Sequence, residues 1–439
     1  MTKKIFEHVA MNENNPDFQK AISRLKPLYQ RSNDLRSEFG RDYTRIIFSL
    51  AYRRLKHKTQ VFFAVKDDHV CTRSEHVNLV ESISYTIANY LGLNTELTKA
   101  IAVGHDLGHA PFGHGGERII DEIAKEYGLQ SFWHEQNSLH FIDEIETLED
   151  NSHHHHNLNL TYAIRDGIIS HCGEMNQKNI IKREEYIDLN NYTKAGLYNP
   201  YTWEGCVVKM SDKIAYLARD IEDALRLKVL KQTKVDKLKL LINNVCKEYK
   251  FTAINNGTIV NYFIQDVCKN SNLSDGIALS DEAHEIMKII MKFNYENIYL
   301  IDRLKIHANY VKLILNSIFD FLLKYDKLAK EKNTNIIDEL LKDRDNYPQI
   351  IDSFICWLEK YSKITGMKRP EIYQNKIIYD FTKDDKAIIR CIIDYLSGMS
   401  DEYIIKIFNE LIDTENTQGI LAVLRYKERD LVNNINQDN

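Results

Sequence analysis

Apolar residues recur at helical spacing along most of the chain. Between residues 41 and 56 the apolar positions fit one amphipathic helix, and they are Ile46, Ile47, Leu50, Ala51 and Leu55. Beyond residue 230, the segments 235–249 and 310–325 show the same period and alternate with Asn-rich connections. The pattern therefore predicts a protein built mainly from amphipathic helices.

Start and stop signals place two further helices before residue 105. The first is expected to run from Glu75 to about Leu91, where Gly92 would end it, and Asn94 would cap the second, which ends close to His105. Neighbouring antiparallel helices of similar length bring the start of one beside the end of the next. Residues at the start of the first helix and the end of the second are therefore expected to converge in a bundle core.

Strands have little place in this pattern. The short apolar run at residues 60–65 is the one small strand that we expect. Only 6 prolines and 17 glycines occur in 439 residues, which favours helices joined by short loops and an all-α fold with at most a small β-hairpin. No linker divides the chain, so we expect one large unit, with an N-terminal arm (1–34), a core (35–230) and a helical C-terminal region packed on it (231–439).

The composition indicates in which cellular compartment the protein works and what kind of molecule it binds. The formal charge of −5 and the pI near 6.4 argue against broad attraction to polyanions and fit a small anionic substrate better. The seven cysteines form no C-x-x-C pair, which predicts reduced thiols rather than disulfides or a zinc-thiolate site. Because no signal peptide and no membrane-length apolar run is visible, a soluble cytoplasmic protein is expected.

Histidines are concentrated in one part of the chain. Thirteen of the 16 lie between His57 and His171. Four of these form a tract at 153–156, which we interpret as a solvent-facing loop in preference to a metal site. The others include the string HDLGHAPFGH, in which His105 and Asp106 could both bind a metal and the glycine and proline breaks would aim His109 and His114 beyond it.

Two more segments contain candidate catalytic or binding residues. In WHEQNS, His134 stands beside Glu135, and a carboxylate there can raise the pKa of the imidazole, although a helix-capping network is the alternative. In SDKIAYLARDIED, one helix face carries Asp212, Tyr216 and Asp220 at i, i+4 and i+8. Lys213 and Arg219 flank that face and are as consistent with surface ion pairs as with ligand contacts.

Together these segments supply a mixed nitrogen and oxygen set for a divalent ion. Two imidazoles and two carboxylates can hold such an ion while leaving positions for water and substrate, and they are His76, His105, Asp106 and Asp212. A metal-assisted hydrolase is the first hypothesis. The arginines of the 41–56 helix are interpreted either as solvated or acid-paired or as contacts to phosphate or another subunit; they are Arg41, Arg45, Arg53 and Arg54.

These segments, in this order, resemble the HD-domain deoxynucleoside triphosphate triphosphohydrolases, a family that includes bacterial dGTPases and the animal enzyme with a sterile alpha motif. The similarity covers roughly residues 35–230, through RSEFGRDYTRIIFSLAYRRLKHKTQVF, TRSEH, AVGHDLGHAPFGHGGE, HEQNS and SDKIAYLARDIEDA. At 134–137 the chain reads HEQN, closer to the animal HEQGS than to the bacterial H-N-x-Q, with Asn137 in place of glycine. No sterile alpha motif precedes the core.

The resemblance implies a role for each site residue. His76, His105, Asp106 and Asp212 would bind one divalent ion (Mn, Fe, Mg or Zn), and the catalytic group near the α-phosphate would be His114, His134 and Glu135. Substrate contacts would come from Gln60, Arg73, His109, Lys213, Tyr216, Asp220 and Tyr299. Within that set, Arg73 and Lys213 would bind phosphate and Tyr216 would pack against the deoxyribose.

The family reaction converts a dNTP, either dGTP or several dNTPs, to a deoxynucleoside and inorganic triphosphate. The resemblance also implies a homo-oligomer, as a tetramer or hexamer, and an activating nucleotide at a second site. Two alternatives stay open: another HD phosphohydrolase acting on cyclic or modified nucleotides or nucleic-acid ends, and a nucleotide-sensing or weak single-strand-binding protein. A basic groove formed by the arginines of 41–54 would favour the latter.

Overall fold

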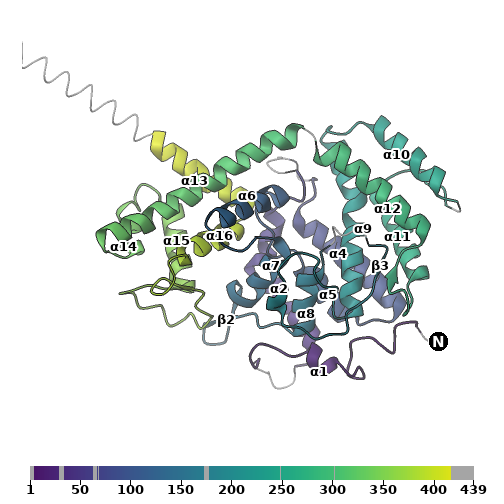
Figure 1. Ribbon diagram of the computed structural model, residues 1–439, viewed down its shortest axis with the longest axis horizontal. Coiled ribbons are helices and arrows are strands. Elements are labelled where there is room, and N and C mark those ends of the chain that lie inside the picture. The colour runs from purple at the N-terminus through teal and green to yellow at the C-terminus, as the bar shows by residue number, and fades with distance from the viewer. Residues whose placement is uncertain are drawn as a thin grey trace, which may run out of the picture.

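The computed structural model describes residues 4–28, 34–62, 67, 69–172, 177–247, 249–300 and 302–416. Its central bundle packs α5 against α2, α4, α8 and α9, and these helices carry the predicted core segments (Figure 1). The bundle helices are α2 (Glu38–Phe48), α4 (Arg73–Leu91), α5 (Thr95–Gly104), α8 (Tyr162–Ser170) and α9 (Trp203–Arg226). The all-α prediction is confirmed.

Shorter elements connect the bundle. The helical ones are α1 (Phe18–Ala21), α3 (Leu50–Arg54), α6 (Gly113–Glu126) and α7 (His134–His140), with 3-10 turns η1 (Leu55–His57) and η3 (Leu189–Asn191) and a π-turn η2 (Phe141–Ile145). Among the residues that the structure describes, three two-stranded sheets lie at the periphery. They pair β1 (Thr147–Glu149) with β2 (His155–Asn157) and β3 (Asn179–Ile180) with β4 (Ile277–Ala278) in antiparallel fashion, and β5 (Ser362–Lys363) with β6 (Tyr379–Asp380) in parallel.

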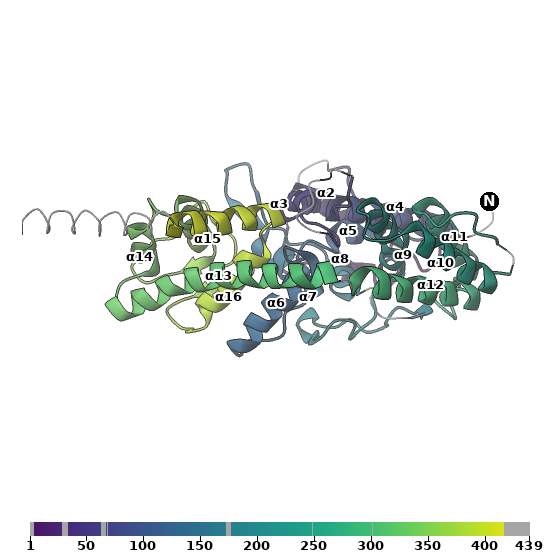
Figure 2. The same cartoon turned by 90° about the horizontal axis from the view of Figure 1, so that it is seen from above.

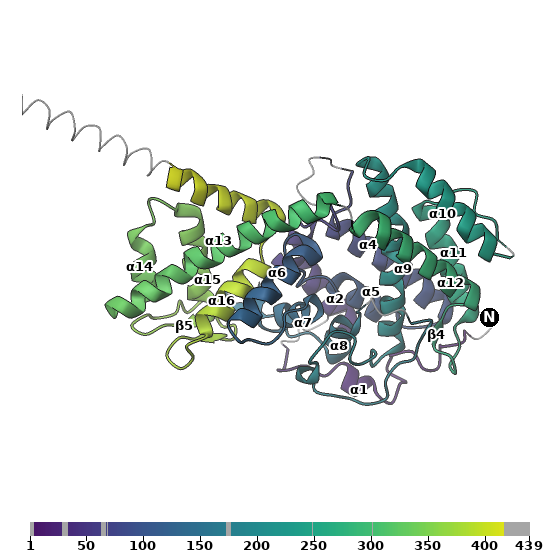
Figure 3. The same cartoon turned by 45° about the horizontal axis from the view of Figure 1, so that its top comes forward.

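The helices beyond residue 230 form two groups at opposite ends of the bundle (Figures 1 and 3). One group packs along α9 and comprises α10 (Gln232–Val245), α11 (Asn256–Asn270), α12 (Asp281–Asn294) and the π-turn η4 (Tyr295–Tyr299). The long helix α13 (Asp302–Lys332) crosses from there to the other group (Figure 2). That second group comprises α14 (Ile336–Lys342), α15 (Pro348–Tyr361), α16 (Ala387–Ser397) and a helical stretch at 401–416, and both α13 and α16 contact α6.

The two helices predicted before His105 are present. Thr72 and Glu75 form a capping box at the start of α4, and Gly92 ends it with a φ of 89°. The Asn94 side chain accepts from the backbone N–H groups of Glu96 and Leu97 and so caps α5. These local signals fix the ends of both helices.

The structure differs from the prediction at two segments, and a third is described only in part. The single helix over 41–56 is wrong, because Ser49 adopts an extended conformation (ψ 152°) and its hydroxyl caps α3. The tract at 153–156 is not a simple loop, since His155 and His156 belong to β2 and pair with β1. Of the predicted strand at 60–65, residues 63–65 lie outside the described residues.

The arginines of the 41–54 segment are largely engaged within the chain. Arg41 lies near Asp34 and Glu38, Arg45 donates to the carbonyl of Leu158 at 2.8 Å, and Arg54 pairs with Glu146 at 2.7 Å. The acid-paired interpretation of this face is therefore favoured. Within the described part of the chain, no helix combines the length and the apolar character that crossing a membrane requires.

Gly108 lets the segment after α5 approach α7 closely. A Cβ at Gly108 would lie 2.1 Å from the backbone nitrogen of Ser138 and 2.3 Å from the carbonyl carbon of Asn137. Its own N–H donates to the Ser138 hydroxyl at 2.9 Å, and that hydroxyl donates to the carbonyl of His105 at 2.8 Å. The backbone that carries His105 and Asp106 is thus fixed against α7.

We predict that Gly108→Ala lowers the free energy of unfolding by about 2–3 kcal/mol, because rigid backbone atoms occupy the space that a methyl group needs. Gly115→Ala is the matched control, since nothing lies within 4 Å of a Cβ there and alanine favours a helix. Chemical denaturation of both variants measures the difference. Equal stability of the two variants would contradict the close approach at Gly108.

Candidate metal and catalytic site

The four predicted metal ligands lie together in the bundle. His76 is in the first turn of α4, His105 and Asp106 follow α5, and Asp212 lies on α9. The Nε2 atom of His76 is 2.9 Å from Oδ1 of Asp212, while Nε2 of His105 is 3.8 Å from the same oxygen and 3.7 Å from Oδ1 of Asp106. The convergence expected from antiparallel neighbouring helices is therefore what the structure shows.

The hydrogen bonds of His105 favour a metal ligand. Its Nδ1 lies 2.7 Å from the carbonyl oxygen of Ala102, and because a carbonyl only accepts, Nδ1 carries the proton. Nε2 is buried without a hydrogen-bond partner among the described residues, and it is the ring atom that remains available to bind a metal when Nδ1 is held by the carbonyl. A backbone carbonyl that fixes the tautomer of a ligating imidazole is the usual support of a metal site, so the residues present fit a divalent ion.

Arg73 keeps Asp106 ionised inside the protein. Asp106 is only 3% exposed, and its Oδ2 lies 2.6 Å from Nη1 of Arg73. Burial opposes the carboxylate, but Arg73 and the surrounding imidazoles outweigh it, so the pKa of Asp106 falls well below its ordinary value. Arg73, which we expected at the phosphate, thus contacts a candidate ligand, and its Nε has no partner among the described residues.

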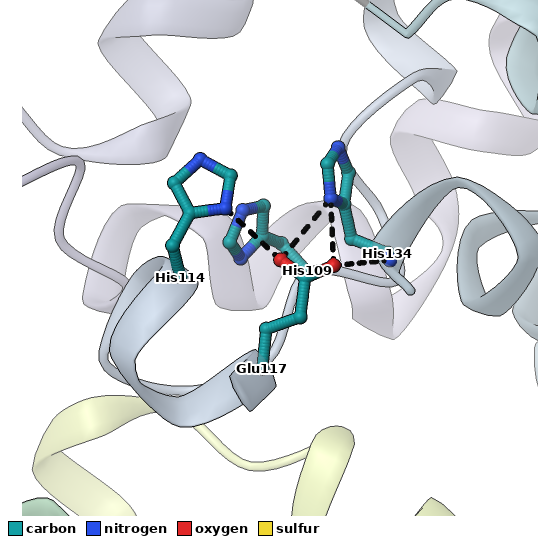
Figure 4. A group of neighbouring side chains, drawn as sticks. All are labelled: His109, His114, Glu117 and His134. Carbon is teal, nitrogen blue, oxygen red and sulfur yellow. Dashed lines mark hydrogen bonds and ion pairs between the residues drawn. The ribbon is translucent and has the colours of Figure 1, made fainter. Parts of the chain in front are cut away.

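A second cluster lies beside the first and centres on Glu117 (Figure 4). This carboxylate is one turn after His114 on α6 and accepts from Nδ1 of His114 at 3.0 Å and from Nδ1 of His134 at 3.2 Å. The backbone N–H of His134 donates to it as well, at 2.9 Å. His109 stacks on His134 with ring centroids 4.7 Å apart. Glu117 therefore joins the two predicted catalytic histidines.

The charges of this cluster are set by burial and by two carboxylates. Burial would keep His134 neutral, but Glu135, 3.5 Å from Nδ1, and Glu117 together raise the pKa of His134 to about 10. Burial and the nearby cation Arg73 lower the pKa of His109 well below its ordinary value. At neutral pH a protonated imidazole therefore stacks on a neutral one. His114 differs from both, since 63% of its side chain is exposed to solvent.

His171 connects the two clusters. Its ring lies 4.9 Å from that of His105 and 5.6 Å from that of His134, centroid to centroid. Nδ1 donates to the carbonyl of Ile168 at 2.6 Å, and burial together with His105 lowers the pKa of His171 to about 4. A continuous row of imidazoles results, in the order His76, His105, His171, His134, His109 and His114.

The face predicted on α9 is present in the structure and extends from the first cluster towards Tyr299. Asp212 and Asp220 are both on it, and the Tyr299 hydroxyl donates to Oδ2 of Asp220. The other oxygen of Asp220 and Oε1 of Gln60 are buried acceptors without a partner among the described residues. Burial raises the pKa of Asp220 to about 6. Unpaired buried acceptors are costly, so each of these two atoms is available to accept a hydrogen bond from water or from a ligand.

The remaining predicted contacts are Lys213 and Tyr216. Lys213 is fully buried, and burial together with Lys209 lowers its pKa to about 8. Tyr216 is half-buried on the same helix. Arg219, which flanks this face, lies 4.0 Å from Glu222, a distance that fits the surface ion-pair interpretation.

Two residues of the site were not predicted from the sequence. The i, i+3 spacing of His114 and Glu117 on a helix could have indicated Glu117. His171 stands alone after α8 with no motif around it, so only the packing of α8 against α5, α7 and α9 brings it to the site.

Comparisons with known proteins identify the family of this chain. A family model described as HD domain matches residues 73–217, which span both clusters. A relative from Clostridium tetani is 31% identical over 87% of this chain and 87% of its own length. One from Caldanaerobacter subterraneus is 34% identical over 70% and 79%, and one from Desulfatibacillum aliphaticivorans is 36% identical over 66% and 74%. Each is named a deoxyguanosinetriphosphate triphosphohydrolase-like protein.

The helical bundle, its neighbouring histidine and aspartate side chains and the family match thus define an HD-domain protein. More narrowly, the chain belongs to the family of deoxyguanosinetriphosphate triphosphohydrolase-like proteins. The resemblance noted in the sequence is confirmed.

We predict that Glu117→Gln lowers the pKa of His134 from about 10, because one of two carboxylates that favour the imidazolium is lost. In the wild type this pKa lies above the unfolded value near 6.5, so the stabilisation is complete below pH 6.5 and is lost as the pH rises through 10. NMR titration of 15N-labelled histidines measures the pKa. Glu149→Gln, next to the exposed His153, is the control, and an unchanged His134 titration in Glu117→Gln would contradict the assigned coupling.

Proposed function

We propose that this protein is a metal-dependent triphosphohydrolase that converts a deoxynucleoside triphosphate, dGTP or several dNTPs, to the deoxynucleoside and inorganic triphosphate. The observation that carries the proposal is the row of imidazoles, in which His105 fits a divalent ion and the neighbouring carboxylates keep His134 protonated. The names of the family relatives support the substrate class.

The proposed ligands of one ion are His76, His105, Asp106 and Asp212. Imidazole and carboxylate ligands admit Mn, Fe, Mg or Zn. When bound, such an ion polarises an α-phosphoryl oxygen and lowers the pKa of a water molecule. The Arg73 guanidinium holds Asp106 in its ionised, ligating form.

The second cluster supplies the proton. In the proposed step a water molecule loses a proton to solvent and its oxygen bonds to the α-phosphorus, while the bond to the 5′-oxygen breaks. The leaving oxygen takes a proton from His134, which then regains one from solvent. Glu117 and Glu135 keep that proton on His134 until the leaving oxygen, a much stronger base, accepts it. His114 and the neutral His109 flank the same position and are proposed to contact the phosphate oxygens.

The wall formed by α9 is proposed to select the sugar. Tyr216 would pack against C2′ and exclude a ribose hydroxyl, while Asp220 and Gln60 would contact the 3′-hydroxyl region of the sugar. The unpaired acceptor atoms of Asp220 and Gln60 and the Tyr299 contact to Asp220 support this assignment. Lys213, one residue after a metal ligand, is proposed to offset triphosphate charge.

We extend the proposal to a homo-oligomer, tetramer or hexamer, that a nucleotide activates at a second site. Leu240 and Leu241 of α10 are 62% and 55% exposed, which supports a contact between copies. Single-strand binding by the arginines of 41–54 is not part of the proposal, because Arg41, Arg45 and Arg54 already have partners in the chain.

Product analysis tests the function. The purified protein is incubated with each of the four dNTPs and with Mg²⁺, Mn²⁺, Fe²⁺ or Zn²⁺, with and without a second nucleotide, and the products are separated by anion-exchange chromatography. We expect a deoxynucleoside and inorganic triphosphate in equal amounts. Release of pyrophosphate or orthophosphate, or no reaction in any combination, would contradict the proposal.

The same assay includes two variants. His105→Ala should lose both bound metal and turnover, because it removes a proposed ligand. Glu117→Gln should keep the metal and lose about 10²- to 10⁴-fold in kcat, the usual contribution of acid–base catalysis.

A further inference from the structure

Asp401 connects the second C-terminal group of helices to the segment from His109 to His114, which we call the catalytic loop. One carboxylate oxygen of Asp401 accepts from the backbone N–H of Phe112 at 2.8 Å. The other accepts from the backbone N–H of Thr59 at 3.1 Å and from its hydroxyl at 2.7 Å. Asp401 is only 5% exposed, so these hydrogen bonds are shielded from water.

Phe112 is the conformational centre of that loop. Its φ of 62° and the φ of 62° at Gly113 place two consecutive residues in the left-handed region. For a bulky residue this conformation costs on the order of 1–2 kcal/mol, so it persists only where surrounding contacts hold it. The turn separates His109 from His114, and its shape therefore decides whether both rings meet His134.

Lys58 holds the other side of the loop. This residue is 2% exposed, and its ammonium donates to the carbonyl of His109 and, at 3.1 Å, to the carbonyl of Ser397 at the end of α16. Burial lowers the pKa of Lys58 to about 7, and the nearby Asp401 carboxylate partly offsets the effect. Lys58 and Asp401 thus join the loop from His109 to Gly113 to the segment 397–401 at two points.

Asn137 adds a third connection to the same segment. Its amide donates to the carbonyl of Gly108 at 2.6 Å and to the hydroxyl of Ser397 at 3.3 Å. The position is one at which the sequence motif departs from the animal family member. Here its side chain fills the space between α7, the segment after α5 and α16.

We propose that Asp401 and Lys58 are positioning residues for the reaction, which fix the left-handed turn at Phe112 and so set His109 and His114 against His134. The second C-terminal group is then a part of the active site rather than only an addition to the core. This inference rests on the proposed triphosphohydrolase function, since it concerns the geometry of that reaction.

The chain offers a matched control for a purely structural role. Asp394 on α16 is also buried, and it accepts from the Tyr379 hydroxyl at 2.5 Å and lies 2.8 Å from Nε2 of His140. It joins the same C-terminal helices to α7, but none of its hydrogen bonds involves the loop from His109 to His114. Asp394→Asn should therefore lower the stability of the protein without changing the positions of His109 and His114 relative to His134.

The test compares Asp401→Asn and Asp394→Asn in the full-length metal-loaded protein, with kcat, KM, bound metal and Tm measured for each. Asp401→Asn should lower kcat about 10- to 100-fold, as expected for a misplacement near 1 Å, with KM changed less than about threefold and metal content unchanged. Asp394→Asn should keep the wild-type kcat at a temperature where both variants are folded.

Wild-type kcat in Asp401→Asn, or an equal fall in both variants, would overturn the inference. If Asp401→Asn does not fold, Thr59→Val serves instead, because it removes only one hydrogen bond to Asp401, and it should reduce kcat severalfold with KM preserved. A wild-type protein without triphosphohydrolase activity would refute the proposed function and this inference with it, whereas an active wild type with an unaffected Asp401→Asn variant would refute the positioning role alone.

Discussion

Asp106 must stay ionised in the interior of a helical bundle, and much of the site follows from that constraint. Burial alone would protonate it, and the Arg73 guanidinium at 2.6 Å is the largest opposing influence. Arg73 can reach it because α4 begins beside the end of α5, which the capping box at Thr72 and the Asn94 cap determine. The caps of these two helices therefore help to keep Asp106 charged, because they place Arg73 beside it.

The same balance separates the imidazoles by protonation state. His134 lies between Glu117 and Glu135 and is protonated at neutral pH, whereas His109 and His171 are buried beside cations or other imidazoles and are neutral. His105 has its proton fixed on Nδ1 by a backbone carbonyl. One row of similar side chains can thus bind a metal at one end and donate a proton at the other.

Much of this site could be predicted from the sequence, because local signals control it. The Gly92 and Asn94 signals fixed two helices, and the periodicity of Asp212, Tyr216 and Asp220 fixed a helix face. The prediction of a single helix over 41–56 was wrong, because the extended backbone and side-chain cap at Ser49 end one helix and begin another despite a continuous apolar stripe. His171 and Asp401 could not be predicted, since long-range packing places them, and Asp401 lies 289 residues from the backbone group that it binds.

The most direct test of the account is the location and number of metal ions. Crystals grown with Mn²⁺, measured by anomalous scattering and combined with elemental analysis, place each ion and count it per chain. We expect one ion per chain, bound by Nε2 of His105 together with His76, Asp106 and Asp212. A second ion between His109, His114, Glu117 and His134, whose ligand atoms lie within 4.8 Å of one another, would contradict the division into a metal-binding and a proton-donating half. It would favour a dinuclear phosphohydrolase instead.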